Sequence, residues 1–492
     1  MSGERSPHWR LGPAVRWLDS RTLAGGAPYR VITMTDRGAG VVRDFLDGSD
    51  EARVPAIDEL IDRLESAGLL LAPTPAATNH RGVTVVIPAR SAPAPLRELL
   101  NLLPGDIPVV IVDDGSPEPL ADLAQLRSGV QVLRHHHSRG PAAARNAGAE
   151  MVRTPWIAFL DADTIPDENW IAELKGRIDA AASGRSSDPA APRSERVVLA
   201  APRIYALPGP GVAAWFEQRV CALDLGSAPA DVGVGRTVSY VPSAAMLVDA
   251  EAFRQVGGFD ESMAVGEDVD LVWRIAELGR IRYFPDVRVG HRARGTLFAS
   301  LDRRRVYGSS AADLGRRHPG ALRHVDVSVW SFAPWLLGMA VHPFIGLAAA
   351  GAGAAIAPWG TRDLSPAHAR RLAVQGHLLA GGALGRWLIR PMLPATVVVS
   401  LLMPMVGRRL FGFAAAGVGY LVAMDVRAAQ ASIHSPGKAA RLAAESLLAR
   451  TLDDVAYSVG VWQGVLVRRT LEPVLPRVRD LPKIRRRRRA RG

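Results

Sequence analysis

The chain has 492 residues, more than one domain usually holds, so we expect two or three structural units. Its single cysteine, Cys221, excludes an internal disulfide framework and suits a reducing compartment. The formal net charge is +12, of which the run from Lys483 to Arg491 contributes +7, so about +5 belongs to the rest of the chain.

Residues 1–75 predict a small α/β module. Two strand-like runs, 14–18 and 29–34, flank a Gly-Gly turn. Thr35 or Asp36 is placed to cap a helix that ends near Leu46, and a second helix is predicted from Pro55 to Ala67. A closing strand at 69–71 completes a winged-helix-like pattern. The first residues are polar and lack an apolar core, so no signal peptide is expected.

Residues 80–300 alternate strands and helices. Continuous apolar runs suit central strands of a mostly parallel sheet that is covered on both faces. Helical stretches between the runs predict a doubly wound, Rossmann-like α/β domain. The four clearest strand runs are 83–87, 108–112, 130–133 and 156–160.

A linking amphipathic segment, 301–331, leads to an apolar region at 332–425. Residues 332–359 carry one histidine and no charge, over a length sufficient to span a bilayer. Two shorter runs, 391–406 and 410–424, are separated by Arg408-Arg409 and predict a tight hairpin or one broken span. Buried helices of a soluble domain are the alternative, which the charge-free Gly/Ala stretch makes less favourable.

The C-terminal segment 426–492 contains an amphipathic stretch at 439–469 and the basic tail. The stretch predicts a helix that lies in a membrane interface or packs into a core. The tail is suited to nucleic acid, to anionic lipid or to plain solvation, and its apolar neighbours favour lipid on the cytoplasmic side. With the catalytic domain and the tail both cytoplasmic, the number of membrane crossings must be even.

Two polar motifs follow predicted strands. Asp113 and Asp114 come directly after a strand, where ligands of open α/β sheets bind, and could accept hydrogen bonds from a pyrimidine or a ribose; a simple turn is the alternative. Residues 138–148 open a helix whose N-terminus suits a diphosphate. The three preceding histidines, 135–137, have poor geometry for a metal and predict a solvated loop.

Acidic residues in two further motifs indicate transfer of a group carried on a nucleotide diphosphate. Asp161 and Asp163 end an apolar strand and could hold Mg²⁺ or Mn²⁺ against phosphate oxygens, unless they only cap a surface turn. Asp268 lies in the first turn of a helix, where it could act as a general base. Its neighbour Glu267 could be only a dipole partner. His291 is a candidate metal ligand or phosphate contact, although a lone histidine is usually structural.

These motifs, in this order, resemble the family 2 glycosyltransferases over about residues 82–300. The resemblance implies a GT-A fold, a nucleotide-sugar donor, and an inverting single displacement with Asp268 as base. It implies Mn²⁺ or Mg²⁺ at Asp161, Asp163 and His291. It assigns nucleotide-sugar contacts to Pro88, Arg90, Asp113, Asp114, Arg145, Asp161, Ala162 and Glu267.

One departure from the family concerns the Gln-x-x-Arg-Trp motif of membrane cellulose and chitin synthases. The comparable stretch here, 302–307, lacks that Gln and Trp, so processive polymerisation is not expected. The cluster Arg303 to Arg305 could still hold a diphosphate, or form a solvated face.

The N-terminal module resembles the PqqD-like recognition elements of peptide-natural-product pathways, which bind precursor peptides by β-augmentation. Together with a membrane-attached family 2 domain, it resembles the glycosyltransferases of mycofactocin biosynthesis. This implies transfer of glucose from UDP-glucose to the peptide-derived precursor premycofactocin, with β-1,4 linkages if several sugars are added. A lipid or cell-wall glycan acceptor, and a non-catalytic scaffold, are alternatives. Nucleic acid is not expected, because no aromatic-interleaved basic groove accompanies the tail.

Overall fold

The computed structural model describes residues 9–480 except 13–14, 27–29, 49–54, 72–78, 92, 184–195, 294, 323, 361–363 and 430–434. The basic run at 483–491 therefore lies outside the described residues, as does most of 73–79, which the Pro- and Ala-rich sequence predicts to be a linker. The chain divides after Leu297 into two compact units, which are described separately.

The first unit begins with the predicted small module. Helix α1 (Asp36–Leu46) starts at the predicted cap, where Thr35 Oγ1 accepts a hydrogen bond from the Gly38 N–H at 3.1 Å. The second predicted helix is α2 (Pro55–Ser66). A strand that the sequence pattern missed lies between the two predicted ones. The short strands are β1 (Arg10–Leu11), paired with β5 (Leu70–Leu71), and the sheet β2 (Arg16–Trp17), β3 (Thr22–Gly25) and β4 (Arg30–Thr33).

A mixed sheet forms the rest of the first unit, and all four predicted strands are present in it. They are β6 (Val83–Ala89), β7 (Val109–Asp114), β8 (Val130–His135) and β9 (Trp156–Leu160), which are mutually parallel. The sheet order is β10-β14-β11-β13-β9-β6-β7-β8. Its second half is less regular, because β13 runs antiparallel to both of its neighbours. The added strands are β10 (Thr164–Pro166), β11 (Val197–Ala206), β12 (Ala230–Asp231), β13 (Ala245–Asp249) and β14 (Arg280–His291).

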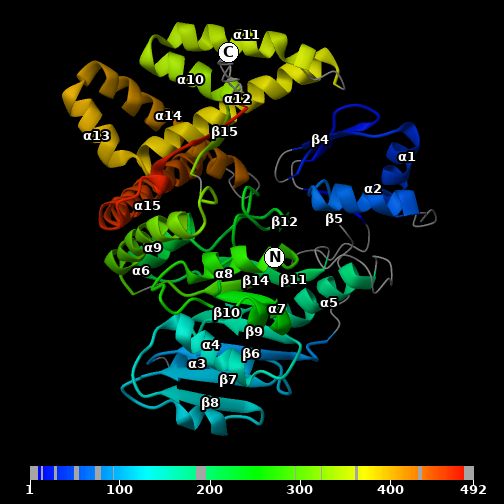
Figure 1. The fold of residues 1–492 in the computed structure, drawn as a ribbon, viewed down its shortest axis with the longest axis vertical. Helices are drawn as coiled ribbons and strands as arrows, with labels where there is room; N and C mark the ends of the chain where they lie inside the picture. The colour runs from blue at the N-terminus through cyan, green and yellow to red at the C-terminus, as the bar shows by residue number, and fades with distance from the viewer. Residues whose placement is uncertain are drawn as a thin grey trace, which may run out of the picture. The chain divides into compact units, whose positions relative to one another are not determined.

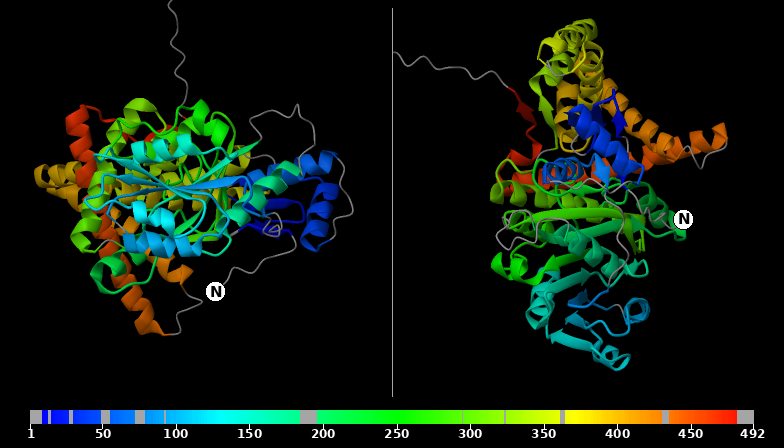
Figure 2. Two further views of the ribbon diagram at one scale, coloured as in Figure 1. Left: turned by 90° about the horizontal axis from the view of Figure 1, so that it is seen from below. Right: turned by 90° about the vertical axis from the view of Figure 1, so that its right-hand side faces the viewer.

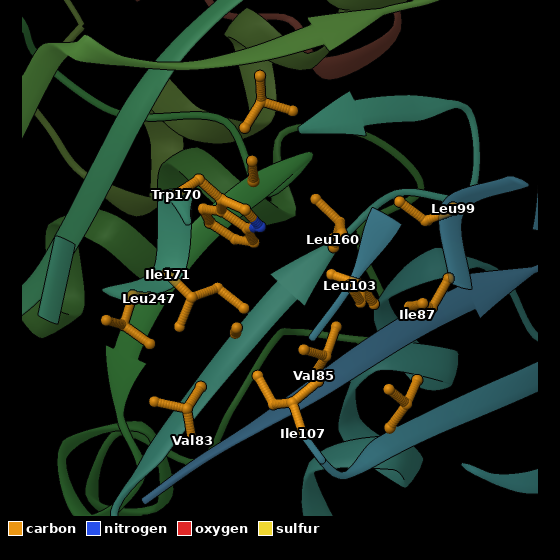
Figure 3. Close-up of a cluster of buried hydrophobic side chains, with 14 of the residues drawn as sticks. Val83, Val85, Ile87, Leu99, Leu103, Ile107, Leu160, Trp170, Ile171 and Leu247 are labelled. Atoms are coloured by element: carbon orange, nitrogen blue, oxygen red, sulfur yellow. The ribbon is translucent and has the colours of Figure 1, made fainter. Parts of the chain in front are cut away.

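Helices cover both faces of this sheet, as the continuous apolar strands predict. On one face, Val83, Val85 and Ile87 of β6 pack with side chains of α3 (Pro93–Leu102) and α5 (Trp170–Ser183), as Figure 3 shows. On the other face lie α4 (Pro141–Met151) and α7 (Ala250–Gln255). Helices α6 (Gly211–Val220) and α8 (Glu267–Ile275) complete the first unit (Figure 1).

The second unit is mostly helical (Figures 1 and 2). A short parallel ladder joins β15 (Asp326–Ser328) near its start to β16 (Arg477–Arg479) near its end. Between these strands and before them lie the helices α9 (Leu297–Arg317), α10 (Val329–Ala340), α11 (Pro343–Gly360), α12 (Pro366–Ile389), α13 (Leu393–Leu402), α14 (Pro404–Ala428) and α15 (Pro436–Arg468).

The apolar region differs from the prediction in where its helices break. The run 332–359 is not one helix, because the chain turns between α10 and α11, where Pro343 begins a new helix. The break in 391–424 falls at Met403, before Pro404, and Arg408-Arg409 lie inside α14. Helix α12 was not predicted.

Two described helices, α11 and the Pro404–Arg427 part of α14, are long and apolar enough to cross a membrane by length and composition. The stretch predicted as amphipathic is α15, and it packs closely on α9. An added Cβ at Gly460 would overlap the carbonyl oxygen of Arg305, and one at Gly464 would lie 2.6 Å from that of Ser309. The C-terminal half of α15 is therefore a packed helix, as the alternative interpretation held.

Candidate active site

The candidate site lies at the carboxyl ends of β6, β7 and β9, where open α/β sheets bind ligands. Parallel pairing places Ala89 of β6 beside Asp113 of β7. Pro88 is half-buried near the end of β6, and Arg90 is exposed directly after it. Strand β9 ends at Leu160, so that Asp161, Ala162 and Asp163 follow it, all partly exposed.

Asp113 and Asp114 are turned into the protein. Asp113 has no exposed surface and accepts hydrogen bonds from the Ser116 and Leu120 N–H groups at 2.9 and 3.2 Å. Burial alone would raise the pKa of Asp113, but these bonds and the Arg134 guanidinium outweigh it and lower the pKa. Protein donors thus already bind both oxygens of the Asp113 carboxylate.

Asp114 organises the loop before α4. It accepts from the Arg139 and Gly140 N–H groups at 2.8 and 2.9 Å and from Ser138 Oγ at 2.7 Å. His135 Nδ1 lies 2.8 Å from the same carboxylate. His135 is therefore held in place rather than solvated, which corrects the loop prediction for this histidine; the clue in the sequence was that the β8 pattern extends to it.

Gly115 shows why the Asp-Asp-Gly order matters. Its φ is +70°, and an added Cβ would lie 2.6 Å from the Ser138 backbone nitrogen. Glycine lets the chain turn there and come close to the loop that Asp114 holds.

Arg145 joins the two acidic motifs. Its residue surface is 4% exposed, and its guanidinium donates to Asp161 Oδ1 at 2.7 Å and to Glu267 Oε1 at 3.2 Å. Phe259 lies beneath the guanidinium, with 5.5 Å from its carbon to the ring centroid. The side chain predicted to contact uracil or diphosphate thus already binds two carboxylates. It fixes the end of β9 against the start of α8.

The first turn of α8 carries two carboxylates with perturbed pKa values. Burial, reinforced by the adjacent Asp268, raises the pKa of Glu267 to about 7, although Arg145 opposes the shift. Burial also raises the pKa of Asp268, against the same arginine and backbone hydrogen bonds. Such a pair titrates together, and perturbed carboxylates of this kind mark candidate functional sites.

The position of Asp268 is set by backbone groups on two elements. Gly266 caps α8 with φ +83°, and Asp268 Oδ1 accepts from the Val269 N–H at 2.8 Å. Its Oδ2 lies 3.4 Å from the Ser243 backbone nitrogen, which donates to it. Because the next residue, Ala244, accepts from the Asp161 N–H at 2.9 Å, one short loop connects both acidic motifs.

A pair of candidate metal ligands lies at the other end of the Asp-x-Asp motif. Antiparallel pairing of β10 with β14 brings His291 Nε2 within 3.4 Å of Asp163 Oδ1. Within the described part of the chain, no group of three or more His, Cys, Asp or Glu side chains is arranged to hold a metal ion. A carboxylate and an imidazole nevertheless suit a divalent cation whose other ligands are water and phosphate oxygens.

Two arginines of the cluster 303–305 have a different role from either one expected. Arg304 is buried, with its Nε 2.7 Å from Asp453 Oδ1 of α15. Arg305 binds Asp302 at 2.7 Å and Gln463 at 2.8 Å. Both side chains hold α9 against α15, so they are neither free for a diphosphate nor simply solvated.

Comparison with known proteins agrees with the motifs. The model of glycosyl transferase family 2 matches residues 84–185, and that of glycosyl transferase family group 2 matches residues 156–423. The chain is 35% identical over 478 residues to the pre-mycofactocin glycosyltransferase of Mycobacterium tuberculosis (strain CDC 1551 / Oshkosh), covering 94% of this chain and 95% of that protein. It is 28% identical over 236 residues to the validoxylamine A glucosyltransferase of Streptomyces hygroscopicus subsp. limoneus, covering 42% of this chain and 50% of that protein.

Among solved structures, the chain is similar to a mannosyltransferase from Pyrobaculum calidifontis in complex with GDP-Man and Mn²⁺. The TM-score is 0.36 at 17% identity, covering 70% of this chain and 88% of that one. The family models and the long match to a curated relative agree with the motif order and the α/β sheet. The chain therefore belongs to the family 2 glycosyltransferases, enzymes with a GT-A-like α/β fold.

Proposed function

We propose that this enzyme transfers glucose from UDP-glucose to premycofactocin, at a membrane and with inversion at the anomeric carbon. The observation that supports the mechanism is the meeting of Asp161, Glu267 and Asp268 around the buried Arg145. Three carboxylates gathered where β9 ends and α8 begins suit a donor diphosphate on one side and an acceptor hydroxyl on the other.

In the proposed reaction, a carboxylate oxygen of Asp268 takes the proton of the acceptor hydroxyl. The freed oxygen forms a bond to the anomeric carbon, while the bond from that carbon to the β-phosphate oxygen breaks. The electron pair of the broken bond leaves with the nucleoside diphosphate. The Ser243 and Val269 N–H groups keep Asp268 in position, and Arg145, bound to Asp161 and Glu267, fixes the donor side relative to this general base.

Asp163 and His291, with Asp161 close by, would hold Mn²⁺ or Mg²⁺. When bound, such an ion offsets the negative charge that develops on the departing diphosphate. Pro88, Arg90 and Ala162 border the same edge of the sheet and are proposed to contact the nucleotide sugar. Asp114 is proposed to position the loop at 138–140 beneath the nucleotide base. Its carboxylate is already bound by backbone groups of that loop and is not proposed to bind the nucleotide directly.

The acceptor assignment rests on the extent of similarity. The match to the pre-mycofactocin glycosyltransferase covers 94% of this chain, and so includes the N-terminal module as well as the catalytic domain. A module that resembles a peptide-binding element has an evident use with a peptide-derived acceptor and little use with a lipid.

Membrane attachment is proposed from the second unit. Large apolar side chains are exposed along α11 and at the turn between α13 and α14. Contiguous exposed apolar surface marks a protein or membrane contact. This same surface favours the second candidate acceptor, a membrane lipid or a lipid-linked cell-wall glycan.

Mass spectrometry of products can separate these proposals. Detergent-solubilised enzyme is incubated with Mn²⁺ and a panel of UDP-sugars, with and without premycofactocin. We expect premycofactocin to gain hexose only from UDP-glucose, and further additions would support a short β-1,4 chain. Hydrolysis of UDP-glucose with unmodified premycofactocin would reject this acceptor and direct the search to lipids. Transfer from a different UDP-sugar would reject the proposed donor.

A further inference from the structure

The helices of the second unit form layers. Helix α12 packs against α11 on one side, where an added Cβ at Gly353 would lie 3.3 Å from His377. On its other side α12 contacts α15, and Arg386 lies 3.4 Å from Asp454. Figure 1 shows α10 and α11 at one side of the second unit and α15 at the other.

The outer layer is apolar, and α11 is its least covered helix. Helices α10 and α11 contain no charged residue, and Gly346 is the one residue of α11 that is buried. Phe344 and Trp359, near the two ends of α11, are 75% and 78% exposed. The turn between α13 and α14 is similar, with Leu401 and Leu402 each 76% exposed. Exposing an apolar surface of this kind to water is unfavourable in free energy. Its chemistry fits contact with the acyl region of a phospholipid membrane.

Contacts between these helices are made by glycines. An added Cβ at Gly346 would lie 2.6 Å from the carbonyl oxygen of Pro334 on α10, and one at Gly385 would lie 2.8 Å from Gly417 on α14. Small residues at the closest contacts between helices, together with large apolar side chains exposed on the outer surface, are the pattern of helices packed in lipid.

The opposite layer carries the charges. Arg390 of α12 binds Asp453 and Asp454 of α15 at 2.5 Å, and Asp425 of α14 binds Arg450 of α15 at 2.6 Å. Charged pairs line the inner sides of α12 and α14, whereas α11 faces outward and carries no charge. The second unit therefore has one apolar layer of helices and one charged layer.

Charged residues also limit the apolar length of α12 and α14. On α12 the uncharged stretch between Arg371 and Arg386 has 14 residues, which is about 21 Å of helix. On α14 the stretch between Arg409 and Asp425 has 15 residues, or about 22 Å. Both are shorter than the roughly 30 Å of a bilayer core. The exposed Arg371 and Arg408 are well placed for lipid phosphates at the rims.

We propose that the second unit is embedded in a single leaflet, with its helix axes along the membrane plane and its α10–α11 layer in the acyl region. In this arrangement none of the described helices of the second unit crosses the bilayer. This rests on the membrane attachment proposed above and adds its geometry.

Arg370 and Arg408 can test the geometry because they begin α12 and α14, which run antiparallel through Gly385 and Gly417. If these helices crossed the bilayer, the two residues would lie on opposite sides. In a single-leaflet arrangement they lie on the same side. The experiment uses full-length protein with Cys221→Ser and one added cysteine, as Arg370→Cys, Arg408→Cys or, as a lipid-facing probe, Phe344→Cys. Each variant is first checked for retained transferase activity.

Spheroplasts and lysed membranes are then treated with a membrane-impermeant maleimide. We expect no labelling of either arginine position from outside, labelling of both after lysis, and labelling of Phe344→Cys only in detergent. Labelling of one arginine position from outside and not the other would overturn the single-leaflet geometry. Protein left in the supernatant after the membranes are sedimented would instead reject membrane attachment itself.

A tryptophan measurement covers the case in which the cysteine variants do not fold. Trp359 of the otherwise unchanged protein is exposed at the end of α11. Its fluorescence should be quenched by brominated phospholipid, with a loss of that quenching in Trp359→Phe. Equal quenching of the two proteins would place α11 outside the acyl region and overturn the proposal.

Discussion

Arg145 contacts carboxylates that are 16 and 122 residues away along the chain. Its planar fork presents separate N–H groups to Asp161 and Glu267 in a fixed geometry, which the single ammonium group of a lysine does not reproduce. We expect Arg145→Met to lower kcat by about 100-fold while the Kd for UDP stays nearly unchanged, and Arg145→Lys to recover part of the loss. Stopped-time assays and calorimetric titration with UDP provide both values. A parallel loss of UDP binding in Arg145→Met would show that the guanidinium contacts the donor.

Asp268→Asn tests the general base directly. The amide keeps the size of the side chain but cannot take the proton, so kcat should fall by roughly 10²- to 10⁴-fold. UDP binding should remain. Glu277→Gln is a matched control, since Glu277 follows the same helix and is exposed. Retained turnover in Asp268→Asn would assign the base elsewhere.

The raised pKa values of Glu267 and Asp268 predict the pH range in which activity falls on the acidic side. Burial raises the pKa of both, that of Glu267 to about 7. The base must be ionised, and a raised pKa keeps it protonated to higher pH, so activity should rise with pH and reach half its maximum at a higher pH than an ordinary aspartate would give. In Glu267→Gln the neighbouring negative charge is removed, and the limb of kcat should move to lower pH. An unchanged limb would indicate that the pair does not titrate during turnover.

At the scale of elements, the α9–α15 crossing depends on Gly460. A methyl group there would overlap the Arg305 carbonyl, and Gly460→Ala should destabilise the second unit by about 1–3 kcal/mol. Thermal unfolding in detergent measures the change. Gly437→Ala on the same helix meets nothing within 4 Å and should be neutral or slightly stabilising. Equal effects of the two changes would mean that the crossing is not tight.

The first half of the catalytic sheet could be predicted because its strands are buried on both faces and therefore read as continuous apolar runs. The bounds of strand β14 could not, since Arg280 and Arg282 interrupt its apolar pattern and are neutralised by Asp231, which is distant in sequence. The reversed direction of β13 follows from tertiary pairing and leaves no local pattern.

The residues of the candidate site could be predicted from the sequence, but the contacts between them could not. The spacing of Asp161, Asp163 and Asp268 pointed to the chemistry. The contact of Arg145 with Glu267 joins segments far apart in sequence, and only the fold brings them together. The helix break at Met403 was misplaced because arginines looked like the stronger interruption, whereas Pro404, which lacks an N–H, begins the new helix.

For the whole molecule, the basic tail should add electrostatic attraction to membrane attachment. Replacing Arg486, Arg487 and Arg488 by Gln should weaken binding to vesicles that contain anionic lipid, by roughly 1 kcal/mol for each arginine at low salt. Vesicle sedimentation at two salt concentrations gives the change. Binding to vesicles of neutral phosphatidylcholine should be unaffected, because the apolar layer remains; an equal loss there would assign the effect to folding instead.

The ladder between β15 and β16 has a consequence for how the protein is made. Val327 pairs with Val478, about 150 residues later, and the Arg477 N–H donates to the Val325 carbonyl at 2.8 Å. The ribosome must therefore translate nearly the whole chain before this ladder can form. Until then the apolar helices form without the β15–β16 ladder. A stalled or prematurely ended chain therefore exposes them to binding by chaperones and to cleavage by proteases.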